Sequence, residues 1–410
     1  MKESIFTALF VVGTLAISTV GQNSSQQPPQ PPSQVVVVPS APPATSPAPI
    51  PKPAQATPVT SAASQASNLN YKGLNFAQLK GRIAEAKRIM QTRPLTTAMS
   101  EPLSMTTLVR IAYYDTRDKK VDFIVLTKEA FLTPDVPTFA LSSSGRQMRS
   151  RTIRGNGVNT PVVIMDETGQ PQLPLLVQYP VEKGGRYIET AYYMSTHPGL
   201  VTPEVVSAGR LYVHNTVEIA REQLRNKGYL IQHKVADIAE RLATVEHVDH
   251  FRFRTEFHPN IYNDIFTLYA LNEGQTYRYS VSSAGAGGMV QMIPSTYRMI
   301  RSRYPNALLM PDFVEGMRNH VNATQAMLLY MQMTWNDLIA SPTVSNAVLT
   351  GIATQEQLMA AGYNSNPARL PGYINRGGAG WTSLIPRETK IYLQIYDSLE
   401  NAVSMTPRKQ

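Results

Sequence analysis

Hydrophobic residues recur at two different spacings along the chain, and the change of spacing separates a strand-rich part from helical parts. Over residues 76–89 they return every third or fourth position, which predicts one amphipathic helix. Runs of β-branched and aromatic residues follow, separated by Asp, Gly, Asn and Pro, and such runs are typical of strands. The predicted strands are residues 108–114, 121–126, 161–165, 173–179 and 186–193.

Helical spacing returns after about residue 207 and continues to the end of the sequence. Helices are predicted over residues 216–227 and 234–243, and the pattern from Pro259 onward is almost wholly helical. We therefore expect an α+β protein overall. Its predicted parts are a strand-rich accessory α+β domain at 69–207, connecting helices at 208–250, an all-α domain at 251–400 and a tail at 401–410.

The first 68 residues carry a different pattern. Lys2 precedes an apolar run over residues 5–16 and then small residues up to Gly21, which predicts a secretory signal peptide over residues 1–21. A retained membrane anchor is the alternative, although the run is shorter than the roughly 20 residues of a spanning helix. Residues 22–68 are dominated by Pro, Ala, Ser, Gln and Thr, which predicts a Pro-rich disordered linker.

Charge and cysteine content narrow the class of protein only in part. The net charge of +9 favours an anionic partner, but it does not choose among peptidoglycan, nucleic acid and a membrane surface. The sequence contains no cysteine, so it excludes disulfides, thiolate metal sites and a cysteine nucleophile.

One acidic residue ends an apolar helical stripe. Residues 261–273 are predicted as a single helix, since Pro259 precedes it and Gly274 follows it. Steps of four from Ile261 lead to Glu273, so we expect this carboxyl to face the core, where burial would raise its pKa as a general acid needs. The alternative is that Glu273 turns out to solvent at a fraying helix end.

A loop of small residues follows this helix. Residues 282–296 read Ser-Ser-Ala-Gly-Ala-Gly-Gly-Met-Val-Gln-Met-Ile-Pro-Ser-Thr, and such side chains let the backbone approach a ligand or another helix closely. Gln291 adds a neutral donor and acceptor just beyond the glycines. A phosphate-binding loop is disfavoured, because the P-loop lysine and the preceding strand are both missing from the sequence pattern.

These segments resemble the soluble lytic transglycosylases, a lysozyme-like family related to goose-type lysozyme. The family pattern is a helix ending in a catalytic Glu, then a segment like Ser-x-Ala-Gly-Ala-x-Gly-Leu-Met-Gln-x-x-Pro, and here Gln291 follows Glu273 at the family's distance. Residues 361–367 are similar to the family's Ala-Tyr-Asn-Ala-Gly-Pro block, and residues 386–392 to its Pro-x-Glu-Thr-x-x-Tyr block. The resemblance covers about residues 251–399 and implies an all-α lysozyme-like catalytic domain.

The sequence departs from the family pattern at three places. Gly274 replaces the usual Ser after the catalytic Glu, Met289 and Val290 replace Leu-Met in the loop, and residues 365–366 are Ser-Asn instead of Ala-Gly. The missing Ser removes a hydroxyl that could orient the carboxyl or the sugar. We expect an active enzyme with altered substrate fit.

The resemblance implies a peptidoglycan lytic transglycosylase. Such an enzyme cleaves the β-1,4 bond between N-acetylmuramic acid and N-acetylglucosamine and forms 1,6-anhydro-N-acetylmuramic acid. Glu273 would be the single catalytic acid/base, because the substrate's 2-acetamido group acts as the internal nucleophile. The implied substrate-binding residues are Gln291, Tyr363, Asn364, Gly288 and Met289. Core packing is the alternative for Tyr363.

Two other functions fit the same residues. One is a lysozyme-type muramidase that uses Glu273 with water, and the other is a non-catalytic peptidoglycan-binding scaffold of an envelope-spanning machine. In each case we expect an exported, periplasmic bacterial protein, tethered to the inner membrane if the signal is uncleaved. Its expected partners are glycan strands and, through the accessory domain, an envelope or secretion complex. No metal, cofactor, nucleic acid or nucleotide is expected.

Three further groups of side chains are interpreted as structural. Histidines 247, 250 and 258 with Asp249 match no common metal-ligand spacing. Methionines are expected to fill the core at Met289, Met292, Met299, Met327 and Met331. A Ser- and Gly-rich loop with a solvated surface is expected around Arg146, Arg149, Arg151 and Arg154, with contact to peptidoglycan or an acidic partner as the alternative.

Overall fold

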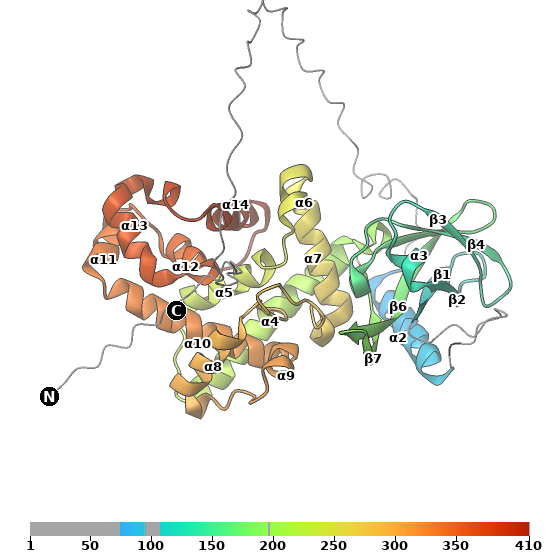
Figure 1. The fold of residues 1–410 in the computed structure, drawn as a ribbon, viewed down its shortest axis with the longest axis horizontal. Helices are drawn as coiled ribbons and strands as arrows, with labels where there is room; N and C mark the ends of the chain where they lie inside the picture. The colour runs from blue at the N-terminus through green and yellow to red at the C-terminus, as the bar shows by residue number, and fades with distance from the viewer. Residues whose placement is uncertain (1–73, 94, 96–106, 196, 410) are drawn as a thin grey trace, which may run out of the picture. The chain divides into compact units, whose positions relative to one another are not determined.

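The computed structural model describes residues 74–93, 95, 107–195 and 197–409 (Figure 1). The predicted signal peptide and Pro-rich linker lie outside these residues. The described chain has a mixed α/β architecture, in which an antiparallel half-barrel sheet is followed by a helical region. None of the helices in the described ranges is long and apolar enough to cross a membrane.

The first predicted helix is α2, Phe76–Thr92. Asn75 begins it with a capping box, since its side chain accepts a hydrogen bond from the Gln78 backbone and the Gln78 side chain accepts one from the Asn75 backbone. The buried stripe of α2, with Leu79 and Met90, packs against the sheet in one hydrophobic cluster. The 3.6-residue period of the sequence therefore predicted this helix correctly.

The described chain forms a seven-stranded sheet around one long strand. Strand β1 pairs along one edge of β6, and β5 and then β7 pair along the other. The strands are β1 Leu108–Asp115, β2 Lys120–Thr127, β3 Pro137–Leu141, β4 Gln147–Thr152, β5 Val162–Met165, β6 Pro171–Lys183 and β7 Arg186–Tyr193, with the short helix α3, Lys128–Leu132, after β2. The five predicted strands are all present, whereas β3 and β4 were not predicted.

Strand β4 corrects the prediction of an arginine-rich surface loop. Arg149 and Arg151 lie within β4, while the alternate residues Met148, Ser150 and Thr152 are buried. Two of the three inward positions are small and polar, so the alternation in burial has no matching alternation in hydrophobicity. The sequence therefore looks like a loop although the backbone is a strand.

Arg146, just before β4, is also wrongly predicted as a solvated residue. Its side chain is only 9% exposed and pairs with Asp115, with Asp166 at 2.9 Å and with Glu167 at 3.3 Å. Burial opposes ionisation of Asp166, but hydrogen bonds from Thr168 and the nearby guanidinium hold the pKa of its carboxyl below the usual value. The network ties together loops from three parts of the sheet.

Helices make up most of the chain after the sheet (Figure 1). The first, α4, begins well before residue 216 because Thr202 caps its N-terminus and Pro203 is tolerated in the first turn. The helices are α4 Pro203–Asn226, α5 His233–Val245, α6 His250–Thr255, α7 His258–Asn272, α8 Pro294–Arg303, α9 Phe313–Arg318, α10 His320–Ile339, α11 Pro342–Leu349, α12 Gln355–Asn364, α13 Leu370–Gly377 and α14 Arg387–Ala402.

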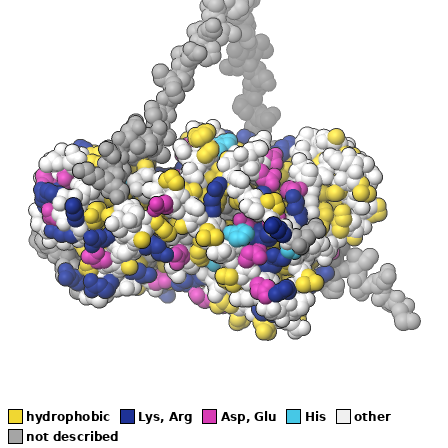
Figure 2. Space-filling view, turned by 180° about the vertical axis from the view of Figure 1, so that it is seen from behind, with side chains coloured by type: hydrophobic (Ala, Val, Ile, Leu, Met, Phe, Trp, Pro, Cys, Tyr) yellow, Lys and Arg dark blue, Asp and Glu magenta, His cyan; other side chains and the backbone are white. Residues whose placement is uncertain are grey.

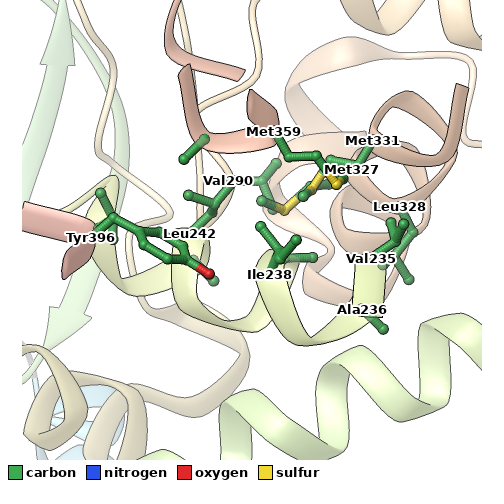
Figure 3. Close-up of a cluster of buried hydrophobic side chains, with 14 of the residues drawn as sticks. Val235, Ala236, Ile238, Leu242, Val290, Met327, Leu328, Met331, Met359 and Tyr396 are labelled. Atoms are coloured by element: carbon green, nitrogen blue, oxygen red, sulfur yellow. The ribbon is translucent and has the colours of Figure 1, made fainter. Parts of the chain in front are cut away.

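Helix α5 lies in the middle of the helical core. Figure 3 shows Val235, Ile238 and Leu242 of α5 packed beside methionines and Val290 from the small-residue loop. The predicted core methionines Met289, Met292, Met327 and Met331 are at most 3% exposed. Met299 is 39% exposed on the outer face of α8, so its predicted burial is wrong.

Charged side chains anchor the end of the chain. Arg408 lies beyond α14 and is only 5% exposed, and its guanidinium pairs with Asp237 at 2.8 Å, Glu240 at 2.6 Å and Glu218. These carboxylates belong to α4 and α5, so the segment predicted as a tail is held against the helical core. Figure 2 shows other Lys and Arg side chains at several separate places on one face, among Asp and Glu.

Candidate functional site

Glu273 comes directly after the last residue of α7 but does not face the core. The stripe that leads to it is buried as predicted, with Ile261 and Ile265 at most 3% exposed. Asn272 ends the helix, and its side chain accepts a hydrogen bond from the Met194 amide at 2.8 Å and donates one to the Met194 carbonyl at 3.0 Å. Glu273 then takes a φ of 41°, and the chain leaves the helical path.

The Glu273 carboxylate instead contacts Lys80 of α2. The distance from Lys80 Nζ to Glu273 Oε1 is 2.6 Å, and the two side chains are 50% and 52% exposed. The prediction of a buried carboxyl at this position is therefore wrong, because the Asn272 contacts with the end of the sheet turn the chain at this point. The catalytic role of Glu273 stays a prediction.

Gly288 allows the close backbone approach that its sequence predicts. It has a φ of 67°, and a Cβ built on it would lie 2.4 Å from the carbonyl oxygen of Met317. The next residues, Met289 and Val290, are fully buried in the helical core. Glycine is therefore required here by both backbone angle and space.

Gln291 uses its amide group to close the same loop. Its Nε2 donates to the Gly288 carbonyl at 2.8 Å and lies 3.3 Å from Ser280 Oγ. The backbone φ of 46° is unusual for a residue with a side chain, and the loop holds it in that conformation. The amide nitrogen therefore stabilises the loop itself, and the substrate-binding role of Gln291 stays a prediction.

Tyr363 connects the Tyr-Asn block to the small-residue loop. Its hydroxyl donates to the Val290 carbonyl at 2.6 Å, and its ring packs against the helical core. Asn364 is the last residue of α12 and is partly buried. The structure thus brings Tyr363 and Asn364 beside the segment that holds Gly288, Met289 and Gln291.

The third block of the resemblance, residues 386–392, contacts Glu246, a residue that was not among the predicted site residues. Tyr392 of α14 places its hydroxyl 2.5 Å from Glu246 Oε1, at the C-terminal end of α5. The neighbouring His247 donates from Nε2 to the Met289 carbonyl at 2.9 Å. All three blocks therefore meet around Glu246 and His247. Glu273 does not join them: within the described ranges its carboxylate bonds only to Lys80.

Burial sets the protonation of both residues at the end of α5. It raises the pKa of Glu246 to about 8, against the lowering effect of the Tyr392 hydrogen bond and with a further rise from the charge of Glu388. It lowers the pKa of His247 to about 3. At neutral pH Glu246 is therefore mostly protonated, and His247 is neutral.

A cavity of about 760 Å³ lies beside these residues, a volume in the range of ligand sites. The sheet and its loops contribute Lys128, Arg154, Glu182 and Tyr193, and the helical region contributes Glu246, His247, Asp264 and Tyr277. None of the six predicted site residues lines this cavity. Two lining residues touch the predicted site, since His247 contacts Met289 and Ser280 contacts Gln291.

Glu246 was missed although the sequence carries a signal for it. Steps of four along α5 lead from Ile238 through Leu242 to Glu246, and both apolar residues are fully buried. This is the same pattern that singled out Glu273 on α7. The two carboxyls differ in the tertiary contacts at the end of each helix, and the spacing of apolar residues does not encode those contacts.

One residue of the histidine-rich junction, His258, packs between two parts of the helical region. His258 contacts the Phe253 carbonyl from Nε2 at 2.8 Å and Ser398 Oγ from Nδ1 at 2.7 Å. Across residues 74–93, 95, 107–195 and 197–409, no group of three or more His, Asp or Glu side chains is placed to hold a metal ion.

Comparisons of the chain with protein-family models, curated proteins and solved structures gave no match.

Proposed function

We propose that this chain is a peptidoglycan lytic transglycosylase with a lysozyme-like catalytic region over residues 251–399. The observation that carries the proposal is the hydrogen bond from Tyr363 to the Val290 carbonyl, because it joins two of the sequence blocks on which the resemblance rests. The contact of Tyr392 with Glu246 brings the third block to the same place. A chance likeness in sequence would give no reason for these three blocks to meet in the fold.

The chemistry of such an enzyme requires one carboxyl that first gives a proton and then takes one. The acid protonates the oxygen that leaves C1 of N-acetylmuramic acid, and the 2-acetamido group stabilises C1 as the internal nucleophile. The carboxylate then removes the proton of the C6 hydroxyl, whose oxygen bonds to C1. The products are an N-acetylglucosamine end and a 1,6-anhydro ring, and no water is consumed. The resemblance gives this carboxyl role to Glu273.

The cellular setting is part of the same proposal. A secretory signal would take the chain to the periplasm, where glycan strands are its substrate. The antiparallel sheet lies outside the resemblance, so we take it as the part that contacts an envelope or secretion complex.

Digestion of purified sacculi tests the activity. We expect released disaccharide products with anhydro ends, which mass spectrometry identifies as lighter by one water than hydrolytic products. Products with reducing ends would support a muramidase instead. Sacculus binding without any release would support the non-catalytic scaffold, which the half-exposed position of Glu273 favours if that residue is the only acid.

A further inference from the structure

Helix α6 is fixed to the rest of the protein along one side. On that inner side Arg252 pairs with Glu256 and with Asp264, each at 2.7 Å. The Phe253 ring stacks on His258, with the ring centroids 4.1 Å apart, and is 9% exposed. These contacts hold α6 against the start of α7. Its other side is left to solvent, and Figure 1 shows α6 at the upper edge of the helical region.

Two aromatic side chains stand on the solvent side of this segment. Phe251, in the first turn of α6, is 67% exposed, and Phe257, in the turn between α6 and α7, is 71% exposed. Single exposed apolar residues are common on protein surfaces. Two exposed aromatic rings beside a group of cations form a different kind of surface, one that is typical of segments that lie at a membrane–water interface.

A pocket of about 480 Å³ adjoins these rings, between α6 and the start of α14. Its lining is apolar at Phe253 and Ile391 and cationic at Arg254, Arg387 and Lys390. Phe251 lies one helical turn before Arg254, on the same side of α6. Aromatic rings and cations are therefore neighbours on this surface.

The three cations of the pocket have no anionic partner. Arg254 donates from Nε to the His250 carbonyl at 3.1 Å, but within the described ranges it makes no ion pair. Arg387 and Lys390, one turn apart on α14, likewise pair with no Asp or Glu of those ranges. Like charges around one pocket repel one another, and an anion that binds among them relieves the repulsion.

The carboxylates of the surrounding elements are placed elsewhere. Glu256 and Asp264 pair with Arg252 on the inner side of α6. Glu388 and Asp397 belong to α14, but neither lines the pocket. The pocket therefore presents a net positive charge, and guanidinium and ammonium groups in such a setting suit the oxygens of a phosphate.

We propose that these five residues, Phe251, Arg254, Phe257, Arg387 and Lys390, form a docking surface for an anionic phospholipid bilayer, here called the α6–α14 patch. The two rings insert at the level of the headgroups and upper acyl chains, and the three cations bind headgroup phosphates. A bilayer fits better than a soluble polyanion, because only a bilayer offers anionic groups and apolar material at the same place. The inference goes beyond the proposed function and does not depend on glycan cleavage.

Sedimentation of the full chain with lipid vesicles tests the surface. Affinity for vesicles of equal parts phosphatidylglycerol and phosphatidylcholine should exceed affinity for phosphatidylcholine alone, and the excess should fall as salt is added. The ratio of the two affinities is the measured quantity, because the apolar run over residues 5–16 would bind both kinds of vesicle alike. Equal affinities would overturn the inference and leave the proposed function untouched.

A triple variant removes the charge of the patch. It combines Arg254→Gln, Arg387→Gln and Lys390→Gln. The affinity ratio should fall by about 100-fold, since each cation close to an anionic membrane surface contributes about fivefold. The matched control removes the same charge at exposed positions outside the patch, and it combines Lys183→Gln, Arg186→Gln and Arg303→Gln. Its ratio should stay within a few-fold of wild type, and an equal fall in both variants would show that net charge alone attracts the vesicles.

Fluorescence tests the insertion of the rings. Phe251→Trp places an indole on the patch, whereas the two native tryptophans, Trp335 and Trp381, are at most 7% exposed. The emission of the variant should shift to shorter wavelength when phosphatidylglycerol vesicles are added, because the new indole leaves water. Phe139→Trp, at a 64% exposed position of β3, is the control and should not shift. Binding that requires the three cations but gives no shift in Phe251→Trp would overturn the bilayer as the partner and indicate a soluble polyanion.

Discussion

The Tyr392 hydroxyl lies 2.5 Å from Glu246 Oε1 and joins the last helix of the described chain to the end of α5. The two residues are 146 positions apart, so only the folded chain makes this contact. It holds a carboxyl in a place where burial favours the neutral form. The stability of the protein should therefore depend on pH through this group.

Glu246→Gln should become more stable relative to wild type as pH rises. The folded pKa of about 8 exceeds the unfolded value of 4.5, so the folded chain holds this proton more strongly. The associated stability is fully present below pH 4.5 and is lost as pH rises through 8. Between low and high pH, the free energy of unfolding of Glu246→Gln relative to wild type should change by an amount on the order of a few kcal/mol, at about 1.4 kcal/mol for each pKa unit. Urea unfolding of both proteins at several pH values measures it, and a pH-independent difference would contradict it.

The Lys80–Glu273 ion pair should add little to stability. Both side chains are about half exposed, and such pairs contribute at most about 1 kcal/mol. Lys80→Ala and Glu273→Gln should each lower the free energy of unfolding by less than that, and the effect should shrink further in high salt. Arg82→Ala, which breaks the similar pair with Glu85 on the same helix, is the matched control. A loss of several kcal/mol at Glu273 would mean that its carboxylate is not exposed as described.

Gly288→Ala should destabilise the loop by about 2 kcal/mol or more, because the Cβ meets the Met317 carbonyl at 2.4 Å and the backbone angle is unfavourable. Gly285→Ala is the control for backbone angle alone. Its φ is 78°, but the nearest atoms to a Cβ, in Pro294, are 3.9 Å away. Thermal unfolding should therefore rank Gly288→Ala below Gly285→Ala, and an equal shift would contradict the close approach to Met317.

Arg146→Met should cost about 3–5 kcal/mol, because it leaves the enclosed carboxylates of Asp115 and Asp166 without their cation. Arg149→Met, three residues along the same strand region but exposed, should change stability by less than about 0.5 kcal/mol. Denaturant unfolding of the two variants gives the comparison. Similar small losses in both would mean that Arg146 is solvated in solution.

The sequence was most informative where burial and hydrophobicity coincide. Unlike Tyr187 and Ile188 of β7, which are 52% and 51% exposed, the stripes of α2 and α7 and the apolar runs of β5 and β6 obey this rule. It failed at β4, where Ser150 and Thr152 occupy inward positions, and at the start of α4, where the signal is a capping Thr202 rather than an apolar period.

In the candidate site, too, some features could be predicted from the sequence and others could not. The close approach of Gly288 to the Met317 backbone could be expected from a run of small residues, because small side chains let two backbone segments come together. The orientation of Glu273 could not, since it depends on Asn272 contacting Met194, a residue 78 positions earlier. Glu246 is likewise defined by partners from distant helices. The spacing of apolar residues along a helix therefore predicts which carboxyls could be buried. Tertiary contacts determine which of them are buried in the folded chain.

The ion pairs of Arg408 restrict how this protein is engineered. Its guanidinium neutralises carboxylates on two helices, so trimming the chain before this residue would expose Glu218, Asp237 and Glu240 to mutual repulsion. An affinity tag or reporter fused in its place would therefore report on a weakened molecule. The exposed turn at Gly184 and Gly185, between β6 and β7, is a better position for an inserted label.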